Sequence, residues 1–338
     1  MDLLKFIGRR LIFLVFLLWG VATCVFILSN LVSDPLVANL SQRNLNNPQI
    51  VAAFQQKWGL DQPLYVQYGV YLKNLLHGDM GISIRTSRSV GAELMRYFPA
   101  TLELGFFAII FASFFGILFG VVSATKRNSW LDQCLRAVSV TGVSVPSFWF
   151  AMIMLYVFYM KLGWAKGPGR ISSGFLPPTD ITGFYVLDSL LAGNIPMALD
   201  CLGHLLLPAI VLGAFTMGLI TRTTRSNLLE VMSTDYIRTA RAKGVPGRLL
   251  MTRHALGNAL IPVLTVIGLG LGNLLGGMVL VETIFSWPGI GQYAYQSVTS
   301  LDFPSITGVS LLIAMNYVVI NLVVDLLYGI IDPRVRYK

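Results

Sequence analysis

The chain has 338 residues, of which 55% are hydrophobic and only 12% are charged, and its formal net charge is +9. Soluble domains carry about twice that share of charged residues, so the composition excludes an ordinary soluble protein and predicts an all-α polytopic membrane protein. The net positive charge is explained by membrane topology and requires no nucleic acid partner.

Six apolar runs are each about long enough to cross ~30 Å of hydrocarbon, because a helix rises by about 1.5 Å per residue. The sequence therefore predicts six transmembrane helices. The first run resembles a signal peptide, but it is too long and no small-residue cleavage site follows, so we expect it to remain as a helix. In chain order the runs are Leu11–Val32, Leu102–Ala124, Val138–Met160, Leu205–Thr221, Leu260–Phe285 and Ile306–Ile331.

Lysine and arginine are more than three times as dense in segments 1–10, 125–136, 222–258 and 332–338 as in the loops on the opposite side of the spans. Positive residues accumulate on the cytoplasmic side of a membrane, so we expect both termini and the 222–258 loop to be inside. The three cysteines, at positions 24, 134 and 201, offer no evident disulfide pair.

The first outer loop, residues 33–99, is long enough to form structure of its own. Ile50, Phe54 and Trp58 share one helical face, and a further helix is expected from Val90 to Tyr97. We expect an amphipathic cap on the outer membrane face, which either contacts an external partner or packs on the helix bundle. Tyr68, Tyr71, Leu72 and Leu75 form a second such face. The predicted divisions are 1–32 (first span), 33–99 (cap) and 100–338 (core of the bundle).

Glycines recur at intervals of four residues in two of the runs. Gly116 and Gly120 lie in the second run, and Gly268, Gly272 and Gly276 lie in the fifth. Glycines at this spacing let helix backbones approach closely, so we expect them to pack helices within the chain or across a dimer interface.

The 233–262 segment is the only long, strongly charged stretch that favours a helix. Residues 233–235 supply helix-start chemistry, and Gly244 followed by Pro246 is a stop signal. A helix over Tyr236–Lys243 on the basic side of the membrane is therefore predicted. Composition alone leaves two interpretations open: a docking surface for another protein, or an ordinary solvated loop helix.

No Asp, Glu, Lys, Arg or His lies in the interior of the six runs. An ion-coupled carrier usually needs such a group at mid-membrane, and the sequence contains neither a P-loop nor a hydrolase motif. We predict a non-enzymatic permeation scaffold, without catalytic or metal-binding residues, that receives energy through its basic helix. An ion-coupled secondary transporter or a channel is the alternative to this scaffold from another class of membrane protein. No substrate-binding residue can be assigned.

Several motifs resemble one known family. Asp235-Tyr-Ile-Arg-Thr-Ala-Arg-Ala-Lys-Gly244, with His254-Ala-Leu-Gly-Asn-Ala-Leu-Ile-Pro262, closely resembles the coupling loop of the dipeptide and oligopeptide ABC importer permeases. The phrases Thr101-Leu-Glu-Leu, Glu282-Thr-Ile-Phe-Ser-Trp-Pro-Gly and Asp325-Leu-Leu-Tyr-Gly-Ile-Ile-Asp-Pro-Arg334 also look like this family. The resemblance runs nearly from end to end.

The resemblance implies a type I ABC importer permease fold with six spans, both termini cytoplasmic, and a large outer loop between the first two spans, in the bacterial inner membrane. It implies four partners: a second homologous permease, two cytoplasmic ATPase subunits that use ATP and Mg, and a periplasmic solute-binding protein. This chain itself would bind no cofactor. Peptides are the implied substrate, with nickel chelates, glutathione, opines or sugars as alternatives.

The resemblance also implies that the 235–244 helix docks on an ATPase subunit. Ile237 and Ala240 would form the face buried in the ATPase groove, and basic residues would meet acidic or polar groups on its rim. The general importer motif has Glu-Ala-Ala where residues 238–240 stand here, so no ion pair of that glutamate is carried over. The implied coupling residues are Asp235, Tyr236, Ile237, Arg238, Thr239, Ala240, Arg241, Ala242, Lys243 and Gly244.

Overall fold

The computed structural model describes residues 3–32, 45–58 and 62–331, and regular structure in these ranges is helical apart from an isolated bridge between Ile82 and Ser89. In these ranges, five helices are long and apolar enough to cross a membrane, or six when the bent pair that begins at Trp130 counts as one span. The prediction of an all-α polytopic membrane protein is therefore confirmed.

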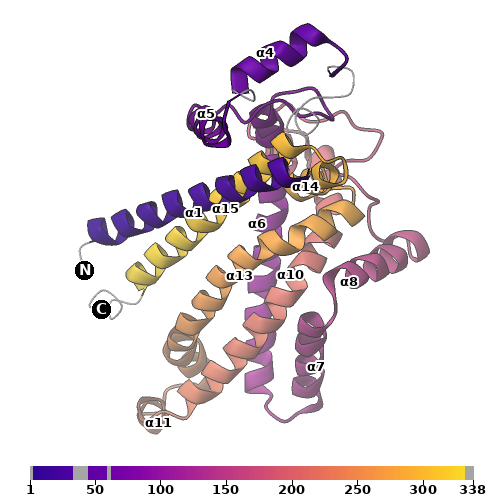
Figure 1. Ribbon diagram of the computed structural model, residues 1–338. Coiled ribbons are helices and arrows are strands. Elements are labelled where there is room, and N and C mark those ends of the chain that lie inside the picture. The colour runs from indigo at the N-terminus through magenta and orange to yellow at the C-terminus, as the bar shows by residue number, and fades with distance from the viewer. Residues whose placement is uncertain (1–2, 33–44, 59–61, 332–338) are drawn as a thin grey trace. The chain divides into compact units, whose positions relative to one another are not determined.

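Figure 1 shows the helices of the described residues. They are α1 (Leu3–Val32), α4 (Pro48–Trp58), α5 (Leu64–Leu76), α6 (Val90–Thr125), α7 (Trp130–Ser144), α8 (Ser147–Met154) with the π-helix η1 (Leu155–Lys161), α9 (Tyr185–Leu191), α10 (Ile195–Met232), α11 (Asp235–Ala242), α12 (Gly247–Leu249) with the π-helix η2 (Leu250–Ala255), α13 (Leu256–Ile284), α14 (Ile290–Thr299) and α15 (Phe303–Ile331).

The chain divides into two compact units. Unit 1 comprises Leu102–Trp287 and the chain from Ile320 onward. Unit 2 comprises the chain up to Thr101 and Pro288–Val319.

The prediction of one continuous helix over Val138–Met160 is wrong. Helix α7 ends at Ser144, Val145 is extended with φ −82° and ψ 129°, and the following helix turns away by 113°. Pro146 explains the break, because proline lacks an amide proton and its ring disfavours a helical conformation in the residue before it.

Helices α6 and α10 extend by ten residues or more beyond their apolar runs. The separate helix expected at Val90–Tyr97 is the first part of α6, which passes Pro99 and continues to Thr125. Helix α10 begins at Ile195, so Asp200 and His204 lie inside it. Hydropathy locates the apolar run of a helix, whereas the helix itself continues for as long as its backbone hydrogen bonds can form.

Within unit 1, α10 packs against α6, α7 and α13 (Figure 1). Glycines permit the close approach of α6: a Cβ atom at Gly116 would lie 2.6 Å from the side chain of Ile220, and one at Gly120 would lie 2.5 Å from that of Thr224. These two glycines therefore contact another helix of the same chain.

The glycines of the fifth run are less uniform. Gly268 is buried and Gly272 is half-buried, whereas the burial of Gly276 is not among the features that the structure describes. Gly270, which the four-residue spacing skips, lies against α10, where a Cβ atom would lie 2.5 Å from the Thr216 side chain.

We expect Gly120→Ala to lower the thermal unfolding midpoint of the purified protein in detergent. The added Cβ would meet the Thr224 side chain at 2.5 Å and the backbone oxygen of Thr221 at 2.9 Å. Such overpacking costs about 1–3 kcal/mol, because α6 and α10 must move apart. Gly69→Ala in α5 is the matched control, since nothing lies within 4 Å of its added Cβ. A Gly120→Ala midpoint equal to that of the control would contradict the prediction.

Within unit 2, α5 packs on α1. The hydroxyls of Thr23 and Tyr68 lie 2.6 Å apart, and the Tyr71 hydroxyl donates to the Ala22 oxygen at 3.3 Å. The Phe26 ring lies 5.2 Å from that of Tyr68 and 5.3 Å from that of Tyr71. Burial raises the pKa of Tyr71 to about 12, so this hydroxyl stays protonated and can donate. The predicted tyrosine face is thus used for packing on the first span.

Candidate functional site

Helix α11 forms a short connection between the end of α10 and the α12–η2–α13 segment, at one end of unit 1 (Figure 1). Thr234 is the N-cap residue, with φ −72° and ψ 155°, but no side chain caps the helix. The hydroxyls of Ser233 and Thr234 instead donate to Glu230 and Val231 oxygens of α10, at 2.7 and 2.6 Å. The predicted helix is confirmed, whereas the 233–234 hydroxyls end α10 instead of starting α11.

The C-terminal end of α11 is a Schellman motif. Gly244 has φ +79°, a left-handed conformation that favours glycine. Its amide donates to the Arg241 oxygen at 3.0 Å, and the Val245 amide donates to the Ala240 oxygen at 3.2 Å. Val245 and Ala240 also pack against one apolar cluster, which adds the hydrophobic contact typical of this motif.

That apolar cluster fixes α11 to the rest of unit 1. We call it the α11 cluster, and Ile237 is its only buried member from α11, with 0% exposure. The expectation that Ile237 enters an ATPase groove is therefore wrong, because its own chain covers it. Ala240 is only half-buried, so the expectation for this residue stays a prediction. The buried members are Ala124 (α6), Leu228 (α10), Ile237 (α11), Leu250 and Ala255 (η2) and Ala259 (α13).

The opposite face of α11 is exposed and basic. The side chain of Arg238 is 72% exposed and forms an ion pair of 3.3 Å with Asp235, itself 95% exposed. Such exposed pairs contribute little to stability, so these charges remain available to a partner. Tyr236 lies at the edge, where its hydroxyl accepts from Asn258 at 2.9 Å. The other exposed residues are Thr239, Arg241, Ala242, Lys243 and Gly244.

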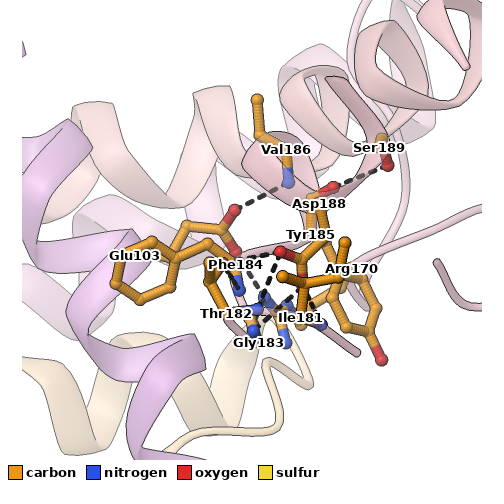
Figure 2. Close-up of polar contacts among 10 residues, drawn as sticks. All are labelled: Glu103, Arg170, Ile181, Thr182, Gly183, Phe184, Tyr185, Val186, Asp188 and Ser189. Atoms are coloured by element: carbon orange, nitrogen blue, oxygen red, sulfur yellow. Dashed lines mark hydrogen bonds and ion pairs between the residues drawn. The ribbon is translucent and has the colours of Figure 1, made fainter. Parts of the chain in front are cut away.

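Sequence reasoning missed a buried ion pair between the beginning of the unit 1 part of α6 and the loop before α9. Figure 2 shows Arg170 beside Glu103. The Arg170 guanidinium lies 3.5 Å above the centre of the Tyr185 ring. Arg170 also donates to the Gly183 oxygen at 3.0 Å, and Glu103 accepts from the Val186 amide at 2.9 Å. The segment from 170 to 186 is thus fastened to α6.

Asp188 organises the same loop (Figure 2). Its carboxylate accepts from the hydroxyl and the amide of Thr182 at 2.6 and 2.9 Å and from the Gly183 amide at 2.9 Å. Burial by itself would raise the pKa of Asp188, but these hydrogen bonds outweigh it and hold the pKa below its usual range. The carboxylate is therefore ionised near neutral pH and serves a structural turn.

We expect Arg170→Met to destabilise the protein strongly, because it leaves the Glu103 carboxylate buried without its cation. Removing one partner of a buried pair costs about 3–5 kcal/mol. The thermal unfolding midpoint in detergent measures the effect. The double variant Arg170→Met/Glu103→Gln removes the unpaired charge and should recover much of the loss. A single variant as stable as the unaltered protein would refute this role.

Comparisons with known proteins cover nearly the whole chain. Residues 116–337 match the model of the binding-protein-dependent transport system inner membrane component, and residues 3–105 match that of its N-terminal region. The chain is 48% identical to a probable D,D-dipeptide transport system permease protein of Escherichia coli (strain K12), over 95% of this chain and 94% of the relative. It is 44% identical to a dipeptide transport system permease protein of Alkalihalophilus pseudofirmus, over 99% and 100%.

A solved structure shares the fold. The chain resembles an inward-facing conformation of the MetNI methionine ABC transporter with a TM-score of 0.51 and 18% identity, over 71% of this chain and 96% of that chain. At this identity the similarity concerns the fold alone.

Proposed function

This chain belongs to the family of binding-protein-dependent transport system inner membrane components, and we propose that it is the permease subunit of an ATP-driven importer that forms the translocation path for di- and oligopeptides. The relatives named as dipeptide permeases match it over almost the entire length of both chains, so the inference does not rest on one shared segment. Membership in the family makes it a multi-pass inner membrane protein.

We propose six spans, with the bent pair of α7 and α8 as the third and both termini in the cytoplasm. The distribution of lysine and arginine supports this orientation. With both termini in the cytoplasm, α11 would lie on the cytoplasmic side. The 33–99 segment, with α4 and α5, then lies on the outer side.

Energy reaches this subunit, in our proposal, through α11. The observation that carries this step is the division of α11 into two faces: Ile237 is covered by its own chain, while Arg238, Arg241 and Lys243 remain exposed. A displacement of the exposed face by an ATPase subunit would therefore be transmitted directly to the helices that hold Ile237. The displacement needs a difference in affinity between two states, which ATP binding to the ATPase subunits would supply.

The complete importer would contain a second homologous permease, two ATPase subunits that bind ATP and Mg, and a periplasmic solute-binding protein, with no cofactor on this chain. Purification from the native membrane in mild detergent, followed by identification of the co-purifying proteins, tests this composition. We expect a second polytopic permease and one or two P-loop ATPases. A chain that comes out alone in several mild detergents would refute the importer and favour a channel or an ion-coupled transporter.

A further inference from the structure

The beginning of α7 carries a carboxylate that accepts hydrogen bonds from two other helices, α6 and α10. Asp132 has no exposed surface. Arg225 of α10 donates to both of its oxygens, from Nε to Oδ1 and from Nη2 to Oδ2, each at 2.9 Å. The Ser123 hydroxyl of α6 and the Asn128 amide of the α6–α7 turn donate as well, the latter at 3.0 Å. A bidentate guanidinium–carboxylate pair fixes direction as well as distance, so the three helices are joined in one geometry.

The partners of Asp132 adjoin the α11 cluster. Ser123 precedes Ala124, and Arg225 lies three residues, or about one helical turn, before Leu228. Ala124 and Leu228 are both members of the cluster that holds Ile237 of α11. The two helices that Asp132 joins to α7, α6 and α10, are therefore among the elements on which α11 rests, although Asp132 itself lies outside the cluster.

Helix α7 has no residue in the α11 cluster. Its other link to α10 is close backbone packing: a Cβ at Gly142 would lie 2.8 Å from the Ala214 oxygen, and one at Gly218 would lie 2.4 Å from the Ser139 oxygen. Contacts of this kind are less directional than hydrogen bonds, so they fix the position of one helix along the other less firmly. The Asp132–Arg225 pair resists sliding, because its two parallel hydrogen bonds are directional.

We propose that Asp132 is a positioning residue of the coupling machinery: it fastens α7 to the ends of α6 and α10 that hold α11, so that a displacement of α11 moves the three helices together. This inference rests on the proposed function, in which α11 receives the displacement. Without the Asp132–Arg225 pair, α11 and α10 would move but α7 would not follow them. ATP would then be hydrolysed without a matching movement of the translocation path.

The test compares ATP hydrolysis and uptake of radiolabelled L-alanyl-L-alanine in the same vesicles, reconstituted with the complete importer and its solute-binding protein. Asp132→Asn keeps the size of the side chain but offers one carbonyl oxygen in place of the two that Arg225 contacts. We expect hydrolysis to stay within about twofold of the unaltered complex, while dipeptide taken up per ATP falls at least about tenfold. A residue with a merely structural role would lower both rates together with the yield of complex and leave their ratio unchanged.

Arg136→Gln is the matched control. Arg136 also lies near Asp132, at 3.6 Å, but its side chain is 52% exposed, so its removal should leave the uptake-to-hydrolysis ratio unchanged. Arg225→Lys is the second variant, and it keeps the positive charge but loses the two parallel hydrogen bonds to Asp132. It should lower the uptake-to-hydrolysis ratio, so it provides the test if the Asp132→Asn complex does not assemble. An unchanged ratio in either variant that assembles overturns the proposal, and so does failure of both to assemble. Absence of ATP-driven uptake by the unaltered complex would instead refute the proposed function.

Discussion

An Arg238→Glu/Arg241→Glu variant is expected to purify without its ATPase subunits and to lose ATP-driven uptake. Both side chains lie on the exposed face of α11, where they belong to no buried network of this chain. Charge reversal replaces attraction by repulsion at an interface with an acidic rim. A loss of about 3 kcal/mol, or roughly 100-fold in affinity, is reasonable for two such sites. Quantitative mass spectrometry of the purified complex and uptake into vesicles measure the two effects.

The matched control is Lys126→Glu/Arg127→Glu, which makes the same change of charge on the exposed turn between α6 and α7. This variant should retain its ATPase subunits, because neither residue belongs to α11. Equal loss in both variants would mean that overall charge, and not the α11 face, holds the complex together. Full retention of the ATPases by the α11 variant would remove the basis for a docking role.

The course of α11 was predictable because its determinants are local. Gly244 and Pro246 predict the end of the helix, and in the structure Gly244 has the left-handed conformation that a Schellman motif requires. The covering of Ile237 was not predictable. An amphipathic pattern shows that one face of a helix is apolar, but whether that face meets its own chain or another one depends on contacts far away in the sequence.

The two buried ion pairs were missed for the same reason. Arg170 is 67 residues from Glu103, and Arg225 is 93 residues from Asp132, so no helical periodicity links the partners. A local signal did exist at Asp132, since the Ser129 hydroxyl caps α7 by accepting from the Asp132 amide at 3.3 Å. That signal explains the start of the helix and says nothing about Arg225.

The break in the third apolar run had a signal that hydropathy ignores. Pro146 stands inside the run, and its stereochemistry opposes a helical conformation at Val145. Apolar residues stand on both sides of the proline, so a window that measures only apolar character predicts one helix where there are two.

Gly244→Asp is expected to leave the abundance of the protein in the membrane near normal and to abolish uptake. A side chain at a left-handed position costs about 1–2 kcal/mol, because its Cβ approaches the following carbonyl oxygen. Apart from Gly244 and its two neighbours in the chain, no residue has an atom within 4 Å of the position where a Cβ would be added, so the penalty comes from the backbone and not from a clash with the core. The chain should relieve it by changing φ, which breaks the hydrogen bonds from Gly244 to Arg241 and from Val245 to Ala240 and turns the exposed face of α11 away from its partner.

Two further variants separate this explanation from an effect of charge. Gly247→Asp adds the same carboxylate three residues later, at a position with open space and no left-handed backbone, and should transport normally. Gly244→Asn should retain part of the uptake, because asparagine tolerates the left-handed conformation better than other residues with a side chain. Uptake by Gly244→Asp at the normal rate and abundance would show that the exit geometry of α11 is not required. Equal loss in Gly244→Asp and Gly247→Asp would assign the effect to the added negative charge beside the basic face, and the ATPase content of the two purified complexes would then show whether that charge prevents docking.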